Sequence, residues 1–329
     1  MFEVKTAFPL DEKLKTRYLL EEDYSLEYSV KHIIYYSAIR PLFPMSLRHL
    51  LQKRFFSGSS YNDNFVMEDF VREVEQRQNG VMPGAGDKTF TQDLYKNQSE
   101  CAVVLSHDVE DADGFAYIPK VIALEEKYGF KSSWNIVPYK YPIDRGIIDE
   151  IRNSGHEIGI HGYNHDGKLY ASEKIFRQRV PHINRALDEY GAVGFRSPLV
   201  HRNLLWLQLL NIEYDASCFD YDPFQPMPGG TGSIWPFIAG KFTELPYTLP
   251  QDHTLFYVLY QKDITIWKNK IDWIVRHKGV ILTLTHPDYL IQARHFSMYE
   301  ELLQYLKSVP GAWHCLPKEL ARHWKTLCG

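Results

Sequence analysis

Three separated segments of the chain each end an apolar run with side chains that could hold a metal or move a proton. They read CAVVLSHDVE at 101–110, GHEIGIHGYNH at 155–165 and GVILTLTHP at 279–287. Short apolar runs are typical of buried strands, and the chemistry of β/α-barrel enzymes lies at the carboxyl ends of such strands. The three segments therefore predict a single site, whose candidate residues are Asp108, Glu110, His161, His165 and His286.

Two histidines four positions apart, His161 and His165, could aim both imidazoles at one point. Two neutral imidazoles and one carboxylate suit Zn²⁺ or another borderline transition metal, with a position left for water. Asp108 and Glu110 are two apart at a strand end, so both can face one side. If one carboxylate is a ligand, the other is free to act as a base in metal-assisted hydrolysis.

Two further residues could complete such a site. His286 follows the run VILTLT; its functional interpretation is a general acid for a leaving group, and the alternative is a structural histidine at a strand end. Arg196, in GFRSP, could hold the base carboxylate by a charge-assisted hydrogen bond, or it could be an ordinary surface arginine.

From residue 101 onward, strand-like and helix-like segments alternate along the chain. Strands are expected at 102–106, 132–137, 157–161, 194–196, 212–217 and 280–285. Helices are expected at 115–128, 143–153, 172–190, 204–210, 268–277 and 298–308. This alternation predicts parallel strands, arranged as a sheet or a barrel.

Two regions depart from the alternation. Residues 220–253 are rich in Pro and Gly, and we expect the segment GGTGSIWPF there to form a rim in which Trp235 offers a stacking face to substrate; an ordinary structural loop is the alternative. Residues 1–98 show helix-like stretches instead. The helices are expected at 25–39, from Ser46 to Gly58 and at 67–78, and a linker is expected at 79–98.

Composition excludes some classes of protein and favours others. The 329 residues include 37 basic and 41 acidic ones, a formal net charge of −4, which offers no electrostatic argument for nucleic acid as a partner. No signal peptide or membrane-spanning run is expected, and four scattered cysteines without a CxxC pair indicate free thiols, hence a cytoplasmic location. Residues 33–56 mix apolar and basic side chains; we expect a helical arm packed on the barrel, and contact with the inner face of a membrane is the alternative.

Five short motifs, in this order, resemble those of the polysaccharide deacetylase family (carbohydrate esterase family 4, the NodB-homology domain). They read SHDVED, HGYNH, RSP, YDASCFDYDPF and LTLTHP, and together they span about residues 101–290. The resemblance implies an α/β fold: a distorted (β/α)7-type barrel over 99–329, with a mainly helical N-terminal extension and linker over 1–98. It also implies one divalent transition metal, with Zn²⁺ as first choice and Co²⁺, Ni²⁺ or Mn²⁺ as alternatives.

The resemblance further implies a reaction, the hydrolytic removal of an acetyl group from an N-acetylated sugar or glycan, which is a cleavage of a C–N bond other than a peptide bond. Carried over by position, Asp108 is the general base and Arg196 orients it. Glu110, His161 and His165 hold the metal. The alternatives are an amidase that uses the same site on a non-sugar linear or cyclic amide, and a catalytically inactive relative that only binds glycan.

The resemblance leaves two assignments open. It implies that His286 protonates the departing amine and that Asp222 polarises this histidine, with Asp220 as the alternative. The family's first motif carries an adjacent Asp pair or Asp-x-Asp, whereas this chain has Asp-x-Glu. Asp111 is therefore the alternative metal ligand to Glu110.

Overall fold

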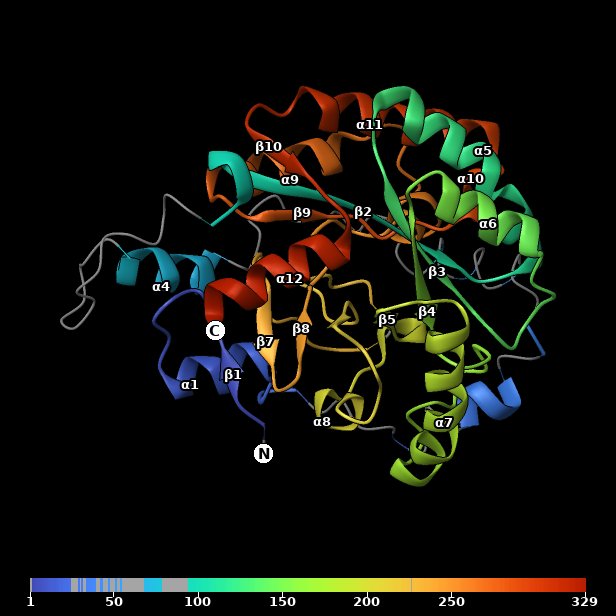
Figure 1. Cartoon of the computed structure of the whole chain (residues 1–329), viewed down its shortest axis with the longest axis horizontal. Helices are drawn as coiled ribbons and strands as arrows, with labels where there is room; N and C mark the ends of the chain where they lie inside the picture. Colours follow the sequence, from blue (N-terminus) through green and yellow to red (C-terminus); the bar gives the residue numbers. More distant parts are fainter. Residues whose placement is uncertain are drawn as a thin grey trace.

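The computed structural model of the protein shows strands and helices alternating over most of the chain (Figure 1). The structure describes residues 2–24, 68–78 and 94–329 except Pro226, together with scattered positions between 29 and 54. The strands are β1 (Val4–Lys5), β2 (Cys101–Val109), β3 (Ser132–Ile136), β4 (Glu157–His161), β5 (Gly194–Arg196), β6 (Tyr214–Asp215), β7 (Phe237–Ala239), β8 (Phe242–Glu244), β9 (Val280–Leu282) and β10 (Ala312–His314). The main helices are α1 (Glu12–Leu14), α4 (Glu68–Gln78), α5 (Ala112–Tyr128), α6 (Arg145–Asn153), α7 (Glu173–Glu189), α8 (Leu204–Leu207), α9 (Thr265–Arg276), α10 (Pro287–Leu290), α11 (Ala293–Ser308) and α12 (Pro317–Cys328).

A curled parallel sheet forms the centre of the molecule. In the described part of the chain, β2, β3, β4, β5, β6 and β8 pair in that order, each parallel to the next, and β9 pairs in parallel with the other side of β2. The backbone N–H groups of Thr248 and Leu249, just after β8, both donate to the carbonyl of Leu282 in β9. These bonds bring the segment after β8 against β9, so the seven parallel strands curl round, and the expected distorted (β/α)7-type barrel is confirmed.

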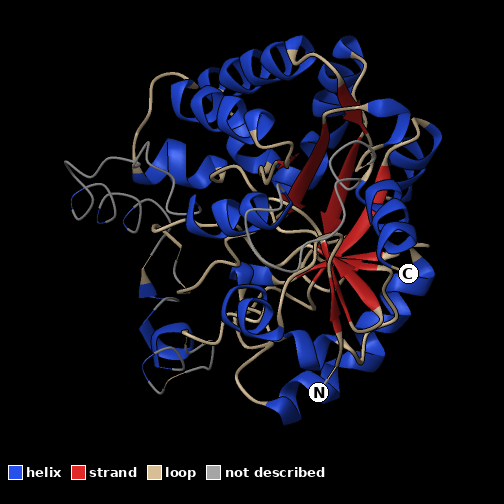
Figure 2. Cartoon of the chain, turned by 90° about the vertical axis from the view of Figure 1, so that its left-hand side faces the viewer, coloured by secondary structure: helices blue, strands red, loops and turns tan. Residues whose placement is uncertain are grey.

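The helices lie outside the strands (Figure 2), and local sequence signals set their limits. In α5, the Asp111 side chain accepts a hydrogen bond from the backbone N–H of Gly114 at 2.8 Å and caps the first turn. Gly129 ends the same helix in the left-handed conformation, with φ at 78°. Because helices cover the outer face of the sheet, every residue of β2 is buried, which explains its continuous apolar run.

The predicted strands and helices from residue 101 onward are present, with boundaries shifted by a few residues. The prediction missed β1, β7, β8 and β10, because strands of two or three residues are too short to show a period in the sequence. It also missed α12, although this helix begins with Pro317 and its Glu319 side chain accepts from the backbone N–H of Leu316.

The N-terminal residues that the structure describes pack against the barrel. β1 pairs antiparallel with β7 and so extends the sheet, and the ring of Phe8 meets that of Trp235 edge-on at 4.8 Å. The predicted helix at 67–78 is present as α4. The expected helix at 25–39 is described in part, and its last residues are helical as η2 (Tyr35–Ile39). The expected helix from Ser46 to Gly58 and the expected linker at 79–98 lie largely outside the described residues.

The prediction that Trp235 offers a stacking face to substrate is wrong. Its side chain is only 3% exposed, and its indole N–H donates to the carbonyl of Lys278 at 3.0 Å. The neighbouring glycines do allow a close approach, but of the protein to itself: the backbone N–H of Gly230 donates to Glu21 at 2.6 Å, and a Cβ on Gly229 would lie 2.4 Å from the same carboxylate. The GGTGSIWPF segment is therefore a structural loop that packs against the N-terminal residues near Glu21.

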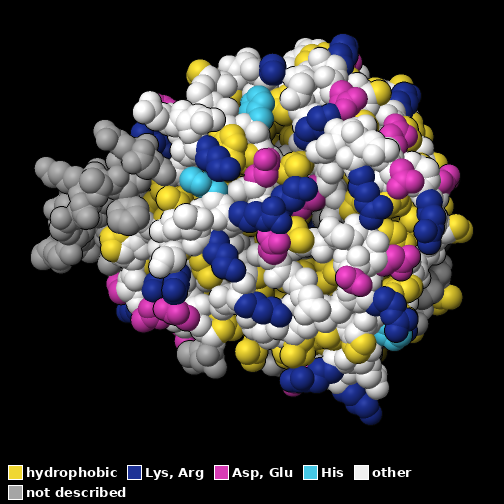
Figure 3. Space-filling model, in the orientation of Figure 1, with side chains coloured by type: hydrophobic (Ala, Val, Ile, Leu, Met, Phe, Trp, Pro, Cys, Tyr) yellow, Lys and Arg dark blue, Asp and Glu magenta, His cyan; other side chains and the backbone are white. Residues whose placement is uncertain are grey.

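On the face shown in Figure 3, basic and acidic side chains are interspersed. Among the described residues, no helix has the length and apolar character needed to cross a membrane. The four cysteines are free thiols; Cys101, Cys218 and Cys315 are buried and Cys328 is half-buried.

Candidate active site

The predicted site residues lie at the carboxyl ends of the barrel strands. Asp108 is the last residue but one of β2, and Glu110 follows that strand directly. His161 is the last residue of β4, and Arg196 is the last residue of β5. Since parallel strands present their carboxyl ends at the same side of a barrel, these side chains converge although up to 88 positions separate them.

Glu110, His161 and His165 form a group whose ligand atoms all lie within 4.8 Å of one another. His165 Nε2 lies 2.9 Å from Glu110 Oε1. Among the described residues, His161 Nε2 is buried without a hydrogen-bond partner, while Nδ1 of the same ring lies 3.1 Å from the carbonyl of Arg196. A buried, unpartnered nitrogen beside a second imidazole and a carboxylate is the donor set that a divalent transition metal requires, so the residues fit such an ion.

Electrostatics favour the ligating forms of these groups. Burial lowers the pKa of His161 to about 4, so its imidazole is neutral at pH 7 and has a lone pair to offer. Burial by itself would raise the pKa of Glu110, but the adjacent His165 outweighs it and the pKa is held well below its usual value. Asp111 caps α5 instead, so Glu110 is the carboxylate beside the two histidines.

Asp108 lies beside this group, buried and held by two donors. Arg196 donates to its Oδ1 atom at 3.1 Å, and the side-chain amide of Asn135 donates to the same atom at 2.9 Å. Oδ2 faces His161 Nδ1 at 3.8 Å. Burial would raise the pKa of Asp108, but His161 and Arg196 together lower it, so the carboxylate is ionised at neutral pH. Asn135 was not predicted; its signal was its place at the carboxyl end of the neighbouring strand β3.

His286 faces Glu110 from the other side, with its Nε2 atom 3.9 Å from Glu110 Oε1. Its partner is Asp252: one carboxylate oxygen lies 2.6 Å from His286 Nδ1, and the other accepts the backbone N–H of His286 at 2.7 Å. Burial would lower the pKa of His286, but Asp252 outweighs it and raises the pKa to about 10. The histidine is therefore protonated at neutral pH.

The assignment of Asp222 or Asp220 as the partner of His286 is wrong. Asp220 forms a buried ion pair with Lys270 at 2.8 Å. Asp222 accepts from Gln225 at 2.7 Å and from Thr254 at 3.2 Å. Both carboxylates thus have other partners, and no motif marked Asp252, since it lies 34 positions before His286.

Backbone strain gathers around the site. His165 has φ at 56°, and the consecutive residues Leu199 and Val200 have φ at 60° and 48°. Left-handed conformations of side-chain-bearing residues cost about 1–3 kcal/mol each and collect where a site needs them. Gly162 has φ at 68°, and a Cβ there would lie 2.4 Å from Pro198, so the turn that delivers His165 packs directly under the RSP motif.

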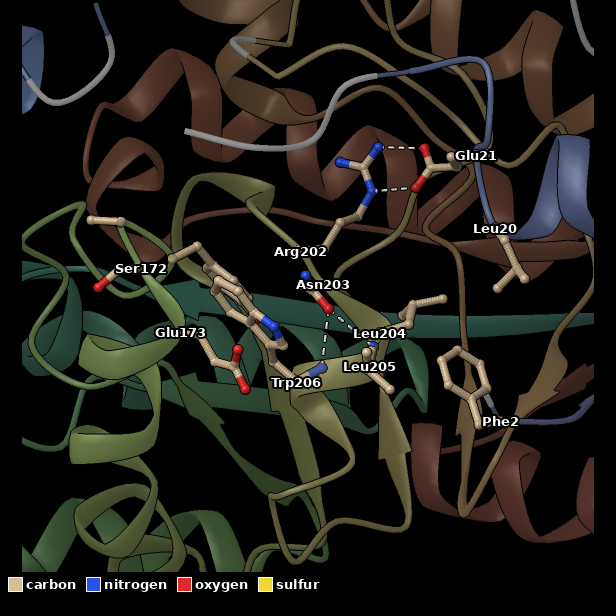
Figure 4. Close-up of a pocket in the computed structure, with 12 residues that line it drawn as sticks. Phe2, Leu20, Glu21, Ser172, Glu173, Arg202, Asn203, Leu204, Leu205 and Trp206 are labelled. Carbon is tan, nitrogen blue, oxygen red and sulfur yellow. Dashed lines mark hydrogen bonds and ion pairs between the residues drawn. The ribbon is translucent and has the colours of Figure 1, made fainter. Parts of the chain in front are cut away.

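A cavity of about 450 Å³ lies on the flank of the barrel (Figure 4). Its walls come from the N-terminal segment, the segment before α7, and the start of α8. Arg202 and Glu21 pair across one wall, and Asn203 accepts from the backbone N–H of Trp206 at 3.0 Å. None of the predicted site residues lines this cavity, so it is separate from the group at the strand ends.

Comparisons with known proteins agree with this geometry. No protein-family model matches the chain. A peptidoglycan deacetylase of Helicobacter pylori is 22% identical over 233 residues, which are 59% of this chain and 78% of that protein.

Solved structures show the same fold. A Mycobacterium smegmatis protein assigned to the polysaccharide deacetylases covers 70% of this chain and 92% of its own, with TM-score 0.56 and 17% identity. A Pseudomonas aeruginosa protein assigned to the same class covers 70% of this chain and 93% of its own, with TM-score 0.55 and 17% identity. An allantoinase, PuuE, covers 70% of this chain and 92% of its own, with TM-score 0.53 and 16% identity. The resemblance to the polysaccharide deacetylases is confirmed, and the chain has their fold.

Proposed function

We propose that this protein is a metal-dependent hydrolase that removes the acetyl group from an N-acetylated sugar or glycan. One observation carries the proposal. Next to the group of Glu110, His161 and His165 lie an ionised carboxylate, Asp108, beside His161, and a protonated imidazole, His286, beside Glu110. Hydrolysis of an amide by activated water needs these two opposite proton-transfer groups on either side of one centre.

Glu110, His161 and His165 would hold one divalent transition metal, with Zn²⁺ as the first choice. When bound, such an ion would supply Lewis acidity, which makes water a better nucleophile at neutral pH and polarises the amide carbonyl. The protein's part is to keep the His161 imidazole neutral and the Glu110 carboxylate ionised at the position where the ion binds. The hydrogen bond of His161 Nδ1 to the carbonyl of Arg196 orients that ring with Nε2 toward the site.

Asp108 would take the proton from the attacking water as the new C–O bond forms. Arg196 and Asn135 both bind its Oδ1 atom, which leaves Oδ2 without these donors and facing His161. The two donors hold the carboxylate in one orientation, so no rotamer freedom has to be lost when substrate arrives.

His286 would give a proton to the amine nitrogen as the C–N bond breaks, so that the amine leaves as a neutral group and acetate remains. Asp252 stabilises the imidazolium through Nδ1 and leaves the proton on Nε2 facing the site. This arrangement makes His286 the general acid and Asp252 the residue that keeps it charged.

The class of substrate rests on the relatives. The Helicobacter relative is a peptidoglycan deacetylase, and two similar folds are assigned to polysaccharide deacetylases, so we propose an N-acetylated glycan. A second candidate is hydrolysis of a non-sugar amide, which the similarity to an allantoinase favours. A relative that only binds glycan would need neither the Asp108 nor the His286 environment.

We also propose a reducing compartment, the cytoplasm, as the place of action, because all four cysteines are free and three of them are buried. Contact with the inner face of a membrane is part of this proposal. Ile34, Ile39, Leu42 and Leu51 carry large apolar side chains that are 42–77% exposed. The sequence of the same stretch also carries Arg40, Arg48, Lys53 and Arg54, as is typical of helices that lie on anionic lipid.

The test combines metal content with acetate release from a panel of N-acetylated glycans. Wild type is compared with the double variant His161→Ala/His165→Ala and with His277→Ala as a control, since His277 pairs with Glu75 away from the site. We expect about one metal per chain in wild type and the control, none in the double variant, and acetate only from the metal-loaded forms. Metal with turnover of other amides alone would support the second candidate. No metal in reconstituted wild type would contradict the mechanism.

A further inference from the structure

A buried polar cluster lies on the outer face of β2, behind the site. It centres on His107, the residue directly before Asp108, whose side chain points to the opposite face of the strand. His107 Nε2 lies 2.7 Å from a carboxylate oxygen of Glu125 in α5, and His107 Nδ1 lies 2.8 Å from the hydroxyl of Thr285. His107 and Glu125 have no exposed surface, and Thr285 is 1% exposed. Burying a carboxylate and an imidazole is costly unless they are bonded, so the cluster must be maintained by these contacts.

Thr285 joins the two strands that carry the proposed base and acid. Its carbonyl accepts the backbone N–H of Asp108 at 2.9 Å, and its backbone N–H donates to Ser106 at 3.2 Å. The next residue along the chain is His286. Thr285 therefore seats against β2 through these two backbone hydrogen bonds and through the bond of its hydroxyl to His107, and this seating contributes to the position of His286 relative to Asp108.

The far end of the cluster is anchored in the helix layer. The Glu125 carboxylate also accepts from the hydroxyl of Tyr299 in α11 at 2.5 Å and from that of Ser132 in β3 at 2.6 Å. The ring of Trp134 stacks on His107, with centroids 4.1 Å apart and planes 16° apart. Glu125 thus accepts from three sides, and the imidazole is held in its plane, so His107 has one available orientation.

We propose that Glu125, acting through His107 and Thr285, is a positioning device that sets the spacing between Asp108 and His286. Where Nε2–H donates to Glu125, Nδ1 accepts the Thr285 hydroxyl proton, so the three groups form one directed chain. The inference rests on the proposed function, because it gives Asp108 and His286 their roles as base and acid. It adds residues outside the site, none of which touches substrate.

The test uses substitutions matched in size. Thr285→Val replaces the hydroxyl with a methyl group of similar size, and Thr285→Ser keeps the hydroxyl. Thr243→Val is the control, because Thr243 is equally buried and its hydroxyl binds a backbone carbonyl, that of Ala321, far from the site. We expect Thr285→Val to lower kcat roughly tenfold with KM and metal content unchanged, since small displacements of reacting groups cost this much or more. Thr285→Ser should restore kcat, and Thr243→Val should lower thermal stability as much as Thr285→Val without lowering kcat.

A double variant tests whether the residues act as one unit. Glu125→Gln keeps the shape but weakens the bond to His107, and Glu125→Gln with Thr285→Val should be no slower than Thr285→Val alone. Multiplying losses, or equal kcat in Thr285→Val and Thr243→Val, would overturn the inference.

A second measurement does not depend on turnover and so separates this inference from the proposed function. The imidazole NMR signals of His286, including the Nδ1 proton shared with Asp252, report where that ring lies. We expect them to move in Thr285→Val and to stay in place in Thr243→Val and Thr285→Ser. Unmoved signals in Thr285→Val would overturn the positioning role even if no substrate had been found. Absence of turnover in wild type with moved signals would count against the substrate proposal and support the positioning.

Discussion

Asp108 and His286 are two titratable groups of one site whose surroundings push them to opposite charges. Arg196 and Asn135 bind the carboxylate and favour its ionised form. Asp252 binds the imidazole and favours its protonated form. Groups whose environments separate their protonation states in this way are the usual assignment of base and acid in hydrolases.

At the residue scale, Asp252→Asn should weaken the proposed acid. The amide cannot stabilise the imidazolium as the carboxylate does, so the pKa of His286 should fall from about 10. The acid form would then be lost at lower pH, and the alkaline limb of the kcat/KM profile should move down in pH, with kcat at neutral pH reduced roughly 10–100-fold. Asp222→Asn is the matched control, because Asp222 has other partners, and its profile should stay where it is.

Arg196→Lys tests the other side of the site. Arg196 donates to Asp108 through one amino group and to the carbonyl of Ala216 through Nε, at 2.8 Å. A lysine ammonium is a single point and cannot span both contacts. We expect kcat to fall roughly tenfold or more while metal content is unchanged. Loss of the metal in this variant would show that Arg196 acts on the ligands rather than on the base.

At the scale of the element, the seven parallel strands of the barrel are buried. Most of their charged side chains either have a bonding partner or belong to the proposed site. Glu157 is an exception at the start of β4, at the end of the barrel away from the site. It accepts the backbone N–H of Lys318 at 3.2 Å, and its Oε1 atom has no hydrogen-bond partner among the described residues. Burial raises its pKa from 4.5 to about 7.

This shift predicts a pH dependence of stability. The folded state holds the Glu157 proton more tightly than the unfolded chain. The contribution of Glu157 to the free energy of unfolding is therefore complete below pH 4.5 and is lost as pH rises through about 7. The loss amounts to roughly 3 kcal/mol. Glu157→Gln should equal wild type near pH 4.5 and be more stable at pH 8, as urea unfolding at both values would show. A constant difference between the two proteins at all pH values would contradict this account.

At the same scale, Gly162 joins β4 to the turn that presents His165. Its φ of 68° and the contact with Pro198 leave no room for a Cβ, so Gly162→Ala should displace the turn. We expect lower thermal stability and a metal affinity reduced at least tenfold, measured by competition with a chelator. Gly191→Ala is the control: it shares the positive φ, 57°, but nothing lies within 4 Å of its Cβ position, so only stability should fall.

At the scale of the whole molecule, the barrel is complete, and the N-terminal segment adds a strand to it and a set of exposed apolar side chains. If that stretch binds a membrane, the full chain should float with anionic vesicles at low salt. Replacement of Ile34, Ile39, Leu42 and Leu51 by serine should abolish flotation and leave acetate release from a soluble substrate intact. Equal flotation of both proteins would remove the membrane proposal without affecting the site.

Local patterns in the sequence determined most of the barrel and the centre of the site. Continuous apolar runs marked the buried strands, and glycines such as Gly129 marked helix ends, because these signals depend only on near neighbours. The four-residue spacing of His161 and His165, and the strand-end places of Asp108 and Glu110, predicted the group that the structure brings together, since residues at the carboxyl ends of parallel strands must converge.

Tertiary structure decided what no local pattern encodes. Asp252 is the partner of His286, although Asp222 lies in the motif, because pairing across 34 positions depends on how two segments pack and not on spacing. Trp235 is covered by Phe8 because the N-terminal strand joins the sheet at β7, more than two hundred residues along the chain. Which polar groups are buried, and which carboxylate each one meets, is settled only when the strands close into the barrel, since burial and long-range contact are properties of the folded chain.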